Sequence, residues 1–111
     1  MRLANVLDDN GRLALIDFDD CGTGWFMYDF AAAVSFLETD PRLPLFRDAW
    51  ISGYTALRPL ADDDIAVLDA MVLLRRMALI AWMGSHADTD LARTHAPPFA
   101  VNTLRLAATL L

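Results

Sequence analysis

A tight turn between two apolar runs, close to the N-terminus, constrains the fold more than any other feature. The runs NVL (residues 5–7) and RLALI (residues 12–16) flank the segment DDNG (residues 8–11). Asparagine and glycine both tolerate the positive φ angles that a two-residue hairpin turn requires. The sequence therefore predicts a β-hairpin over residues 5–16.

Apolar residues recur with helical spacing from about Trp25 onward. The first helix is expected to end by the break at Asp40-Pro41. Its apolar face is formed by Phe26, Phe30, Ala33, Val34 and Leu37. Further helices are expected over residues 44–57, 62–83 and 98–111. The candidate core residues of the second are Leu45, Trp50, Ile51 and Tyr54.

These elements together define the predicted fold class. It is α+β and mostly α, with an N-terminal hairpin followed by about four helices. The third helix is apolar enough to raise the question of a membrane span. Asp69, Arg75 and Arg76 lie within it, and each charge at a bilayer centre costs about 2.5–3.5 kcal/mol. We therefore expect a helix buried in a globular core, with its arginines reaching toward solvent or the acidic loop, and no membrane partner.

The charge balance excludes several classes of function. The 111 residues carry nine basic side chains, all arginine, against fifteen acidic ones, for a formal net charge of −6. Without lysine, this chain cannot form a Schiff base or hold a phosphate with an ammonium group. The acidic balance disfavours nucleic-acid binding, which relies on clustered positive charge. With one cysteine and no signal-peptide pattern, we expect a cytoplasmic protein.

The segment most informative about function is DFDDCG at residues 17–22, directly after an apolar run. We expect that run to be a buried strand. Carboxylates at the end of such a strand commonly hold a divalent cation, because hard cations prefer oxygen ligands. Asp17, Asp19 and Asp20 would repel one another without a positive charge between them. The alternative is that they are solvated loop residues, one of which caps the next helix. Cys21 is expected to be a small packing residue.

Two motif classes match this segment only in part. The calcium-loop pattern D-x-[DN]-x-[DN]-G includes Asp17, Asp19 and Gly22. However, Cys21 stands at the third ligand position and Tyr28 where a bidentate glutamate is needed. A calcium loop is therefore excluded. The segment is also similar to the D-x-D nucleophile motif of haloacid-dehalogenase-type phosphatases, so a metal-dependent phosphatase remains an alternative.

A third resemblance covers a longer part of the chain. NVL (5–7), the Asp-Asn-Gly turn, LIDFDD (15–20) and WFMYDFA (25–31) together resemble the aminoglycoside phosphotransferase family. In that family, a catalytic loop H-x-D-x-x-x-x-N runs into a strand, a turn and a second strand ending in I-D-[FW]. A helix opening with Y-D-[LI]-A follows. The segment LRRMALIAW (74–82) is similar to a later helix of the family. The resemblance implies the C-terminal part of a protein-kinase-like C-lobe.

The resemblance also implies roles for individual residues. Asn5 matches the asparagine that closes the catalytic loop and ligates magnesium. Asp17 matches the aspartate that holds the metal against the nucleotide's phosphates. Asp19 stands where glycine is usual and is expected to be a supporting metal ligand. Asp29 matches a helix aspartate that braces the catalytic loop, a structural role. The implied cofactors are Mg²⁺ and ATP.

The same register implies that the catalytic apparatus is incomplete in this chain. The aspartate that orients the attacking hydroxyl is expected five residues before Asn5, hence before Met1. The lobe with the nucleotide-binding lysine is expected upstream as well. We therefore expect a single partial lobe, with the catalytic-loop end and metal loop in residues 1–24 and a helical subdomain in residues 25–111. The intact form would phosphorylate a small-molecule hydroxyl, and this chain alone would be inactive.

An alternative of another class is a non-enzymatic helical interaction module that self-associates through exposed apolar surface. Other polar clusters give weaker signals. The acids at 62–64 either attract a cationic substrate or form a solvated helix N-terminus. Four potential metal ligands near the C-terminus are spaced irregularly, which favours a loop over a metal site. They are His86, Asp88, Asp90 and His95. Ser85 and His86 lack the context of a catalytic triad.

Overall fold

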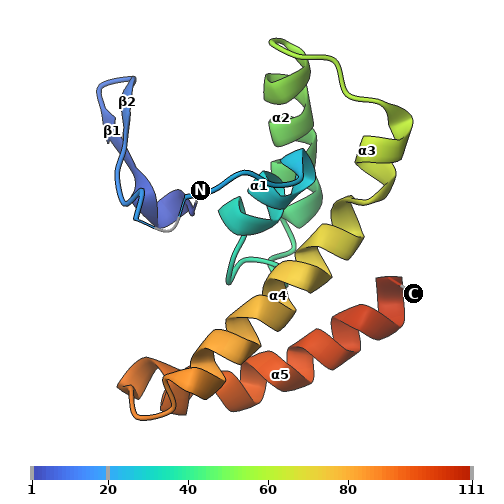
Figure 1. Ribbon diagram of the computed structural model, residues 1–111. Coiled ribbons are helices and arrows are strands. Elements are labelled where there is room, and N and C mark those ends of the chain that lie inside the picture. The colour runs from blue at the N-terminus through green and yellow to red at the C-terminus, as the bar shows by residue number, and fades with distance from the viewer. Residues whose placement is uncertain (1, 20, 111) are drawn as a thin grey trace.

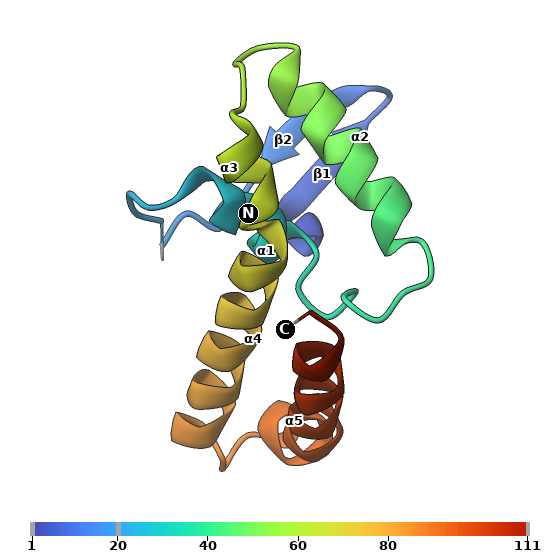
Figure 2. The ribbon, with the colours of Figure 1, turned by 90° about the vertical axis from the view of Figure 1, so that its right-hand side faces the viewer.

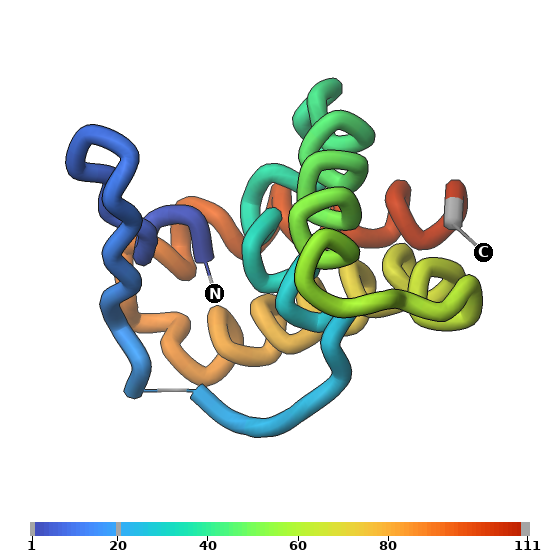
Figure 3. The backbone as a smooth tube through the Cα atoms, turned by 90° about the horizontal axis from the view of Figure 1, so that it is seen from above, coloured from blue at the N-terminus to red at the C-terminus, as the bar shows by residue number. Residues whose placement is uncertain are grey.

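The computed structural model describes residues 2–19 and 21–110 as a small hairpin attached to a helical body (Figure 1). The hairpin stands to one side of the helices in two perpendicular views (Figures 1 and 3). The predicted α+β, mostly helical fold class is confirmed. The elements in chain order are η1 (Leu3–Asn5), β1 (Val6–Asp9), β2 (Arg12–Leu15), α1 (Phe26–Ala33), α2 (Leu43–Thr55), α3 (Asp62–Ala66), α4 (Leu68–Ser85) and α5 (Asp90–Leu110).

The hairpin forms as the sequence predicts. β1 and β2 pair antiparallel, with Asp9 opposite Arg12 at the turn. Asn10 and Gly11 have φ angles of 52° and 85°, so both adopt the left-handed conformation of a two-residue hairpin turn. The Gly11 amide donates a hydrogen bond of 2.8 Å to Asp8 Oδ1, which holds the turn closed.

Gly11→Ala is expected to weaken the hairpin. A side chain in the left-handed region costs about 1–2 kcal/mol, and the φ of Gly11 is 85°. Cross-strand NOEs between β1 and β2, together with amide exchange, would report the loss. Gly22→Ala is the matched control, because no atom lies within 4 Å of the added Cβ and the φ of Gly22 is not in that region. Equal hairpin populations in both variants would contradict this account of the turn.

Helix α4 is the centre of the helical body, because α1 and α5 both pack against it (Figure 2). One core cluster lies where α1 meets the start of α4, and the other lies where the end of α4 meets α5. The buried members of the first are Met27, Phe30, Ala31, Val34, Leu68 and Val72. Those of the second are Leu79, Met83, Ala92 and Phe99.

The ends of the first and third predicted helices differ from expectation. Helix α1 ends at Ala33, and the chain then reverses through Phe36, whose φ is 71°. The helix expected over residues 62–83 is split at Val67, where ψ is 0°. The later piece, α4, continues to Ser85. Apolar spacing alone did not reveal either backbone break.

The prediction for the last helix was wrong at its start. Helix α5 begins at Asp90 and contains Pro97 and Pro98 in its interior. The Ala92 amide donates a hydrogen bond of 3.2 Å to Thr89 Oγ1, so Thr89 caps the helix. Each proline lacks an N–H and costs the helix a backbone hydrogen bond. The burial of Phe99 in the second core cluster favours the helix despite this cost.

Several residues expected in the core are exposed. Leu45 is 64% exposed, because α2 packs through Phe46, Trp50 and Ile51 instead. Strand β2 is exposed along its whole length, so the expectation of a buried strand was also wrong. The hairpin has only two strands and stands beside the helices, which leaves its faces open. Among the described residues, no helix has both the length and the apolar character needed to cross a membrane.

Asp40 provides a pH-dependent contact just before α2. Its carboxylate accepts hydrogen bonds from the backbone N–H, Nε and Nη2 of Arg42. The Arg42 side chain lowers the pKa of Asp40 from 3.8 to about 2. A depressed carboxyl pKa gives stability that is present above pH 4 and lost as the pH falls toward 2.

Carboxyl NMR should therefore show Asp40 titrating near pH 2, with the start of α2 loosening over the same range. Arg42→Gln should raise this midpoint toward 3.8, because it removes the charged donor. A midpoint unchanged by Arg42→Gln would contradict the assignment.

Candidate active site

The segment η1 and the hairpin position Asn5 beside the end of β2. The Asn5 amide donates to Arg2 O at 3.0 Å, which closes the single turn of η1. The Ile16 amide donates to Asn5 O at 3.0 Å, which ties that turn to the residue just before Asp17. The backbone therefore brings together two residues that lie twelve positions apart in the sequence.

The side chains of Asn5 and Asp17 are in direct contact. Asn5 Nδ2 donates a hydrogen bond of 2.7 Å to Asp17 Oδ2. Asp17 has a φ of 65°, a left-handed conformation that is uncommon outside glycine and often marks functional sites. The two residues expected to share a cation are therefore neighbours in space.

The donor set suits Mg²⁺ better than an all-protein metal cage. The hydrogen bond uses one oxygen of Asp17 and leaves a second carboxylate oxygen and the Asn5 amide oxygen as hard donors. Mg²⁺ is usually held by one or two protein carboxylates together with phosphates and water. Within residues 2–19 and 21–110, no group of three or more His, Cys, Asp or Glu residues could hold a metal ion alone. The residues present thus fit a cation shared with a phosphate ligand.

The other acids of the predicted loop are less well defined by the structure. Asp19 is exposed, and its place as a supporting ligand stays a prediction. Asp20 lies outside the described residues. Asp29 lies in the first turn of α1, where the helix dipole favours an acid. Its bracing of the catalytic loop also stays a prediction. Cys21 is exposed, so the expectation of a packing residue was wrong.

The weaker polar clusters have structural explanations. Asp64 Oδ2 accepts a hydrogen bond of 3.0 Å from the Ala61 amide at the start of α3, which matches the helix N-terminus interpretation of this acidic run. His86 stacks on Trp82, with ring centroids 4.4 Å apart, at the end of α4. Its Nδ1 lies 2.9 Å from Trp82 O.

The arginines of α4 do not reach toward solvent or the acidic loop, as had been expected. Arg75 bonds to Ser35 Oγ and Tyr28 Oη, and is half-buried. Arg76 is buried, and its Nη1 donates to Glu38 Oε2 at 2.6 Å. Burial lowers the pKa of the Arg76 guanidinium, and the Glu38 carboxylate opposes that shift.

Sequence analysis did not identify this ion pair. The available signal was that Glu38 is the only glutamate among fifteen acids. Nothing in the sequence linked it to Arg76, which lies 38 positions away.

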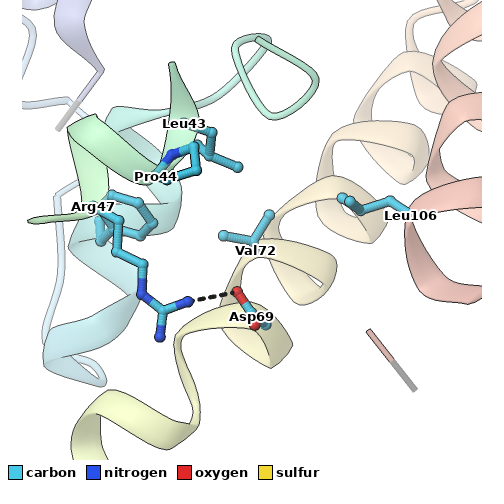
Figure 4. Close-up of a pocket in the computed structure, with 7 residues that line it drawn as sticks. Leu43, Pro44, Arg47, Asp69, Val72 and Leu106 are labelled. Carbon is cyan, nitrogen blue, oxygen red and sulfur yellow. Dashed lines mark hydrogen bonds and ion pairs between the residues drawn. The ribbon is translucent and has the colours of Figure 1, made fainter. Parts of the chain in front are cut away.

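A small apolar cavity of about 210 Å³ lies among α1, α2, α4 and α5. Figure 4 shows Arg47 and Asp69 pointing toward one another on one side, with Leu106 of α5 on the opposite side. Arg47 Nη1 and Asp69 Oδ1 are 3.3 Å apart. Because its lining is otherwise apolar, we assign this cavity to the packing between helices.

Comparison with known proteins identifies the family. Residues 1–70 match the sequence profile of the phosphotransferase enzyme family. The chain belongs to this family. The match includes η1, the hairpin, α1 and α2, so it covers both members of the Asn5–Asp17 pair. The family resemblance inferred from the sequence motifs is confirmed.

Similar proteins extend the match beyond residue 70. The structure of a microcompartment-associated aminopropanol kinase is 46% identical, with a TM-score of 0.82, over 92% of this chain and 33% of that one. The uncharacterized protein sll1119 of Synechocystis sp. is 32% identical over 95 residues, which are 79% of this chain and 25% of the relative. The phosphotransferase chain thus spans a third or less of each relative's length. Its kinase-like fold is confirmed, and so is a phosphotransferase activity on small molecules for its family.

Proposed function

We propose that this chain forms the metal-binding part of an ATP-dependent phosphotransferase that acts on a small-molecule hydroxyl. The contact of 2.7 Å between Asn5 Nδ2 and Asp17 Oδ2 is the observation that carries the proposal. It brings two oxygen-bearing side chains to one point at the end of the hairpin. In the family profile that includes both residues, such a point corresponds to the magnesium site of the catalytic centre.

The roles of the two residues follow from their chemistry. Asp17 supplies a negative charge and a hard oxygen, so it is the main ligand for Mg²⁺. Asn5 supplies a neutral amide oxygen and, through Nδ2, fixes the orientation of the Asp17 carboxylate. When bound, Mg²⁺ bridges the phosphates of ATP and neutralises the charge that develops during transfer. The left-handed backbone at Asp17 sets the direction of its side chain before any ligand arrives.

These residues supply only part of a kinase site. The 111 residues contain no lysine to contact the nucleotide's phosphates, and phosphoryl transfer depends on several positioned charges together. We therefore propose that the isolated chain does not turn over MgATP with an alcohol. The aminopropanol kinase contains a matching segment within a threefold longer chain, which provides a way to test the proposal.

A chimera tests whether this chain can perform its proposed part of the reaction. Residues 1–111 would replace the equivalent third of the aminopropanol kinase, guided by the structural match over 92% of this chain. The chimera is expected to phosphorylate aminopropanol in a coupled ATP assay, whereas the isolated chain gives no product. Asp17→Asn in the chimera is expected to lower kcat about 100-fold or more, because the metal loses its charged ligand.

The matched control in the chimera is Asp63→Asn, which removes the same charge from the exposed start of α3. It is expected to keep the full rate. A folded chimera that works equally well with Asp17→Asn would show that the Asn5–Asp17 pair does not hold the catalytic metal.

A further inference from the structure

A second cavity, of about 500 Å³, lies between η1, the turn after α1 and helix α5. Arg2 lines it and precedes Asn5 by three residues, so the cavity adjoins the proposed metal site. The guanidinium of Arg2 lies 5.3 Å from the centre of the Phe36 ring, which joins η1 to the helical body. The side chains that matter for its chemistry are Arg2, Phe36, Glu38, His95, Phe99 and Asn102.

Glu38 gives this cavity a specific binding capacity. Its side chain is 2% exposed, and Oε2 accepts the hydrogen bond from Arg76. Among the buried side-chain polar atoms of the described residues, Glu38 Oε1 has no hydrogen-bond partner. A carboxylate oxygen buried without a donor is unfavourable and calls for a ligand or water with N–H or O–H groups.

Arg76 fixes the position of this carboxylate and cannot satisfy its second oxygen. Its Nε donates to Thr103 Oγ1 at 2.8 Å, and its Nη2 donates to Phe99 O at 3.1 Å. The guanidinium is therefore held on three sides, with Nη1 alone on Glu38. Glu38 Oε1 is thus a pre-positioned acceptor on the cavity side of a rigid ion pair.

The walls around Glu38 suit a small cation with a short carbon chain. The Phe36 and Phe99 rings lie 5.3 Å apart at 52°, and aromatic faces attract cations while covering apolar groups. Phe36 has a φ of 71°, a strained conformation for a bulky residue that indicates a functional constraint. Arg2 is exposed to water, which screens its charge.

We propose that this cavity binds the acceptor substrate as a small amino alcohol, with its ammonium group donating to Glu38 Oε1. The inference rests on the proposed function, and it deepens that function by naming the substrate class. An ammonium group brings three donors and a positive charge, which a neutral diol lacks. The unpaired oxygen therefore discriminates between the two, as sites built around a buried polar group do.

NMR titration of the full 111-residue chain tests this inference. Aminopropanol is expected to shift the signals of Phe36, Glu38 and Phe99, and propanediol is expected to bind at least tenfold more weakly. Equal affinities for the two ligands would overturn the proposal. So would shifts confined to the acids at 62–64, or no binding of the amine at all, which would leave water as the only occupant of the cavity.

Two variants locate the site without breaking the buried ion pair. Asn102→Leu narrows the cavity and is expected to weaken aminopropanol binding at least tenfold, with the fold intact. Thr94→Leu lies on the exposed surface of α5 outside the cavity lining and is expected to bind normally. Mg²⁺ added to the same samples reports separately on Asn5 and Asp17. Mg²⁺ binding without amine binding overturns this inference alone, and the reverse result overturns the proposed function alone.

Discussion

Arg76→Ala is expected to destabilise the chain by about 3–5 kcal/mol, because it leaves the buried Glu38 carboxylate without its cation. Urea or thermal unfolding would measure the loss. An unpaired buried carboxyl group takes up a proton more readily. The variant should therefore lose less stability at pH 5 than at pH 8, relative to the parent chain.

Two comparisons show whether burial of the charge is the cause. Arg47→Ala removes a half-exposed pair with Asp69 and is expected to cost no more than about 1 kcal/mol. Replacing both Arg76 and Glu38 by methionine removes the unpaired charge and is expected to restore most of the lost stability. Similar losses in Arg76→Ala and Arg47→Ala would contradict the account of a buried ion pair joining α4 to the turn after α1.

Asp17→Asn is expected to weaken Mg²⁺ binding at least about tenfold, because asparagine keeps the shape of the side chain and removes its charge. Calorimetric or NMR titration of the full chain would measure the affinity. The hydrogen bond with Asn5 can persist with an amide oxygen, so the hairpin is expected to stay folded. Asp63→Asn carries the same change of charge at the exposed start of α3 and serves as the control. Equal affinities in the two variants would place the metal elsewhere.

The parts of the fold that the sequence predicted correctly depend on local chemistry. Asn10 and Gly11 determine the hairpin turn through their own φ preferences, so no distant contact was needed to predict it. The contact between Asn5 and Asp17 was also accessible, because the hairpin register carries residue 5 to the end of β2.

The parts that were missed depend on contacts between distant segments. A rule based on Pro98 placed the start of the last helix too late, while Thr89 carried the true capping signal. Arginine is usually exposed, so burial of Arg76 required knowledge of Glu38, Thr103 and the Phe99 carbonyl. The cavity beside Glu38 was hidden for the same reason, since its walls come from both ends of the chain.

The most direct test of the central claim is paramagnetic broadening by Mn²⁺, used as a substitute for Mg²⁺. Small additions to the full chain are expected to broaden the side-chain amide signal of Asn5 and the backbone signal of Asp17 before any others. Broadening that begins instead at the exposed acids 62–64, or equally over all the acidic residues, would contradict a metal site formed by Asn5 and Asp17.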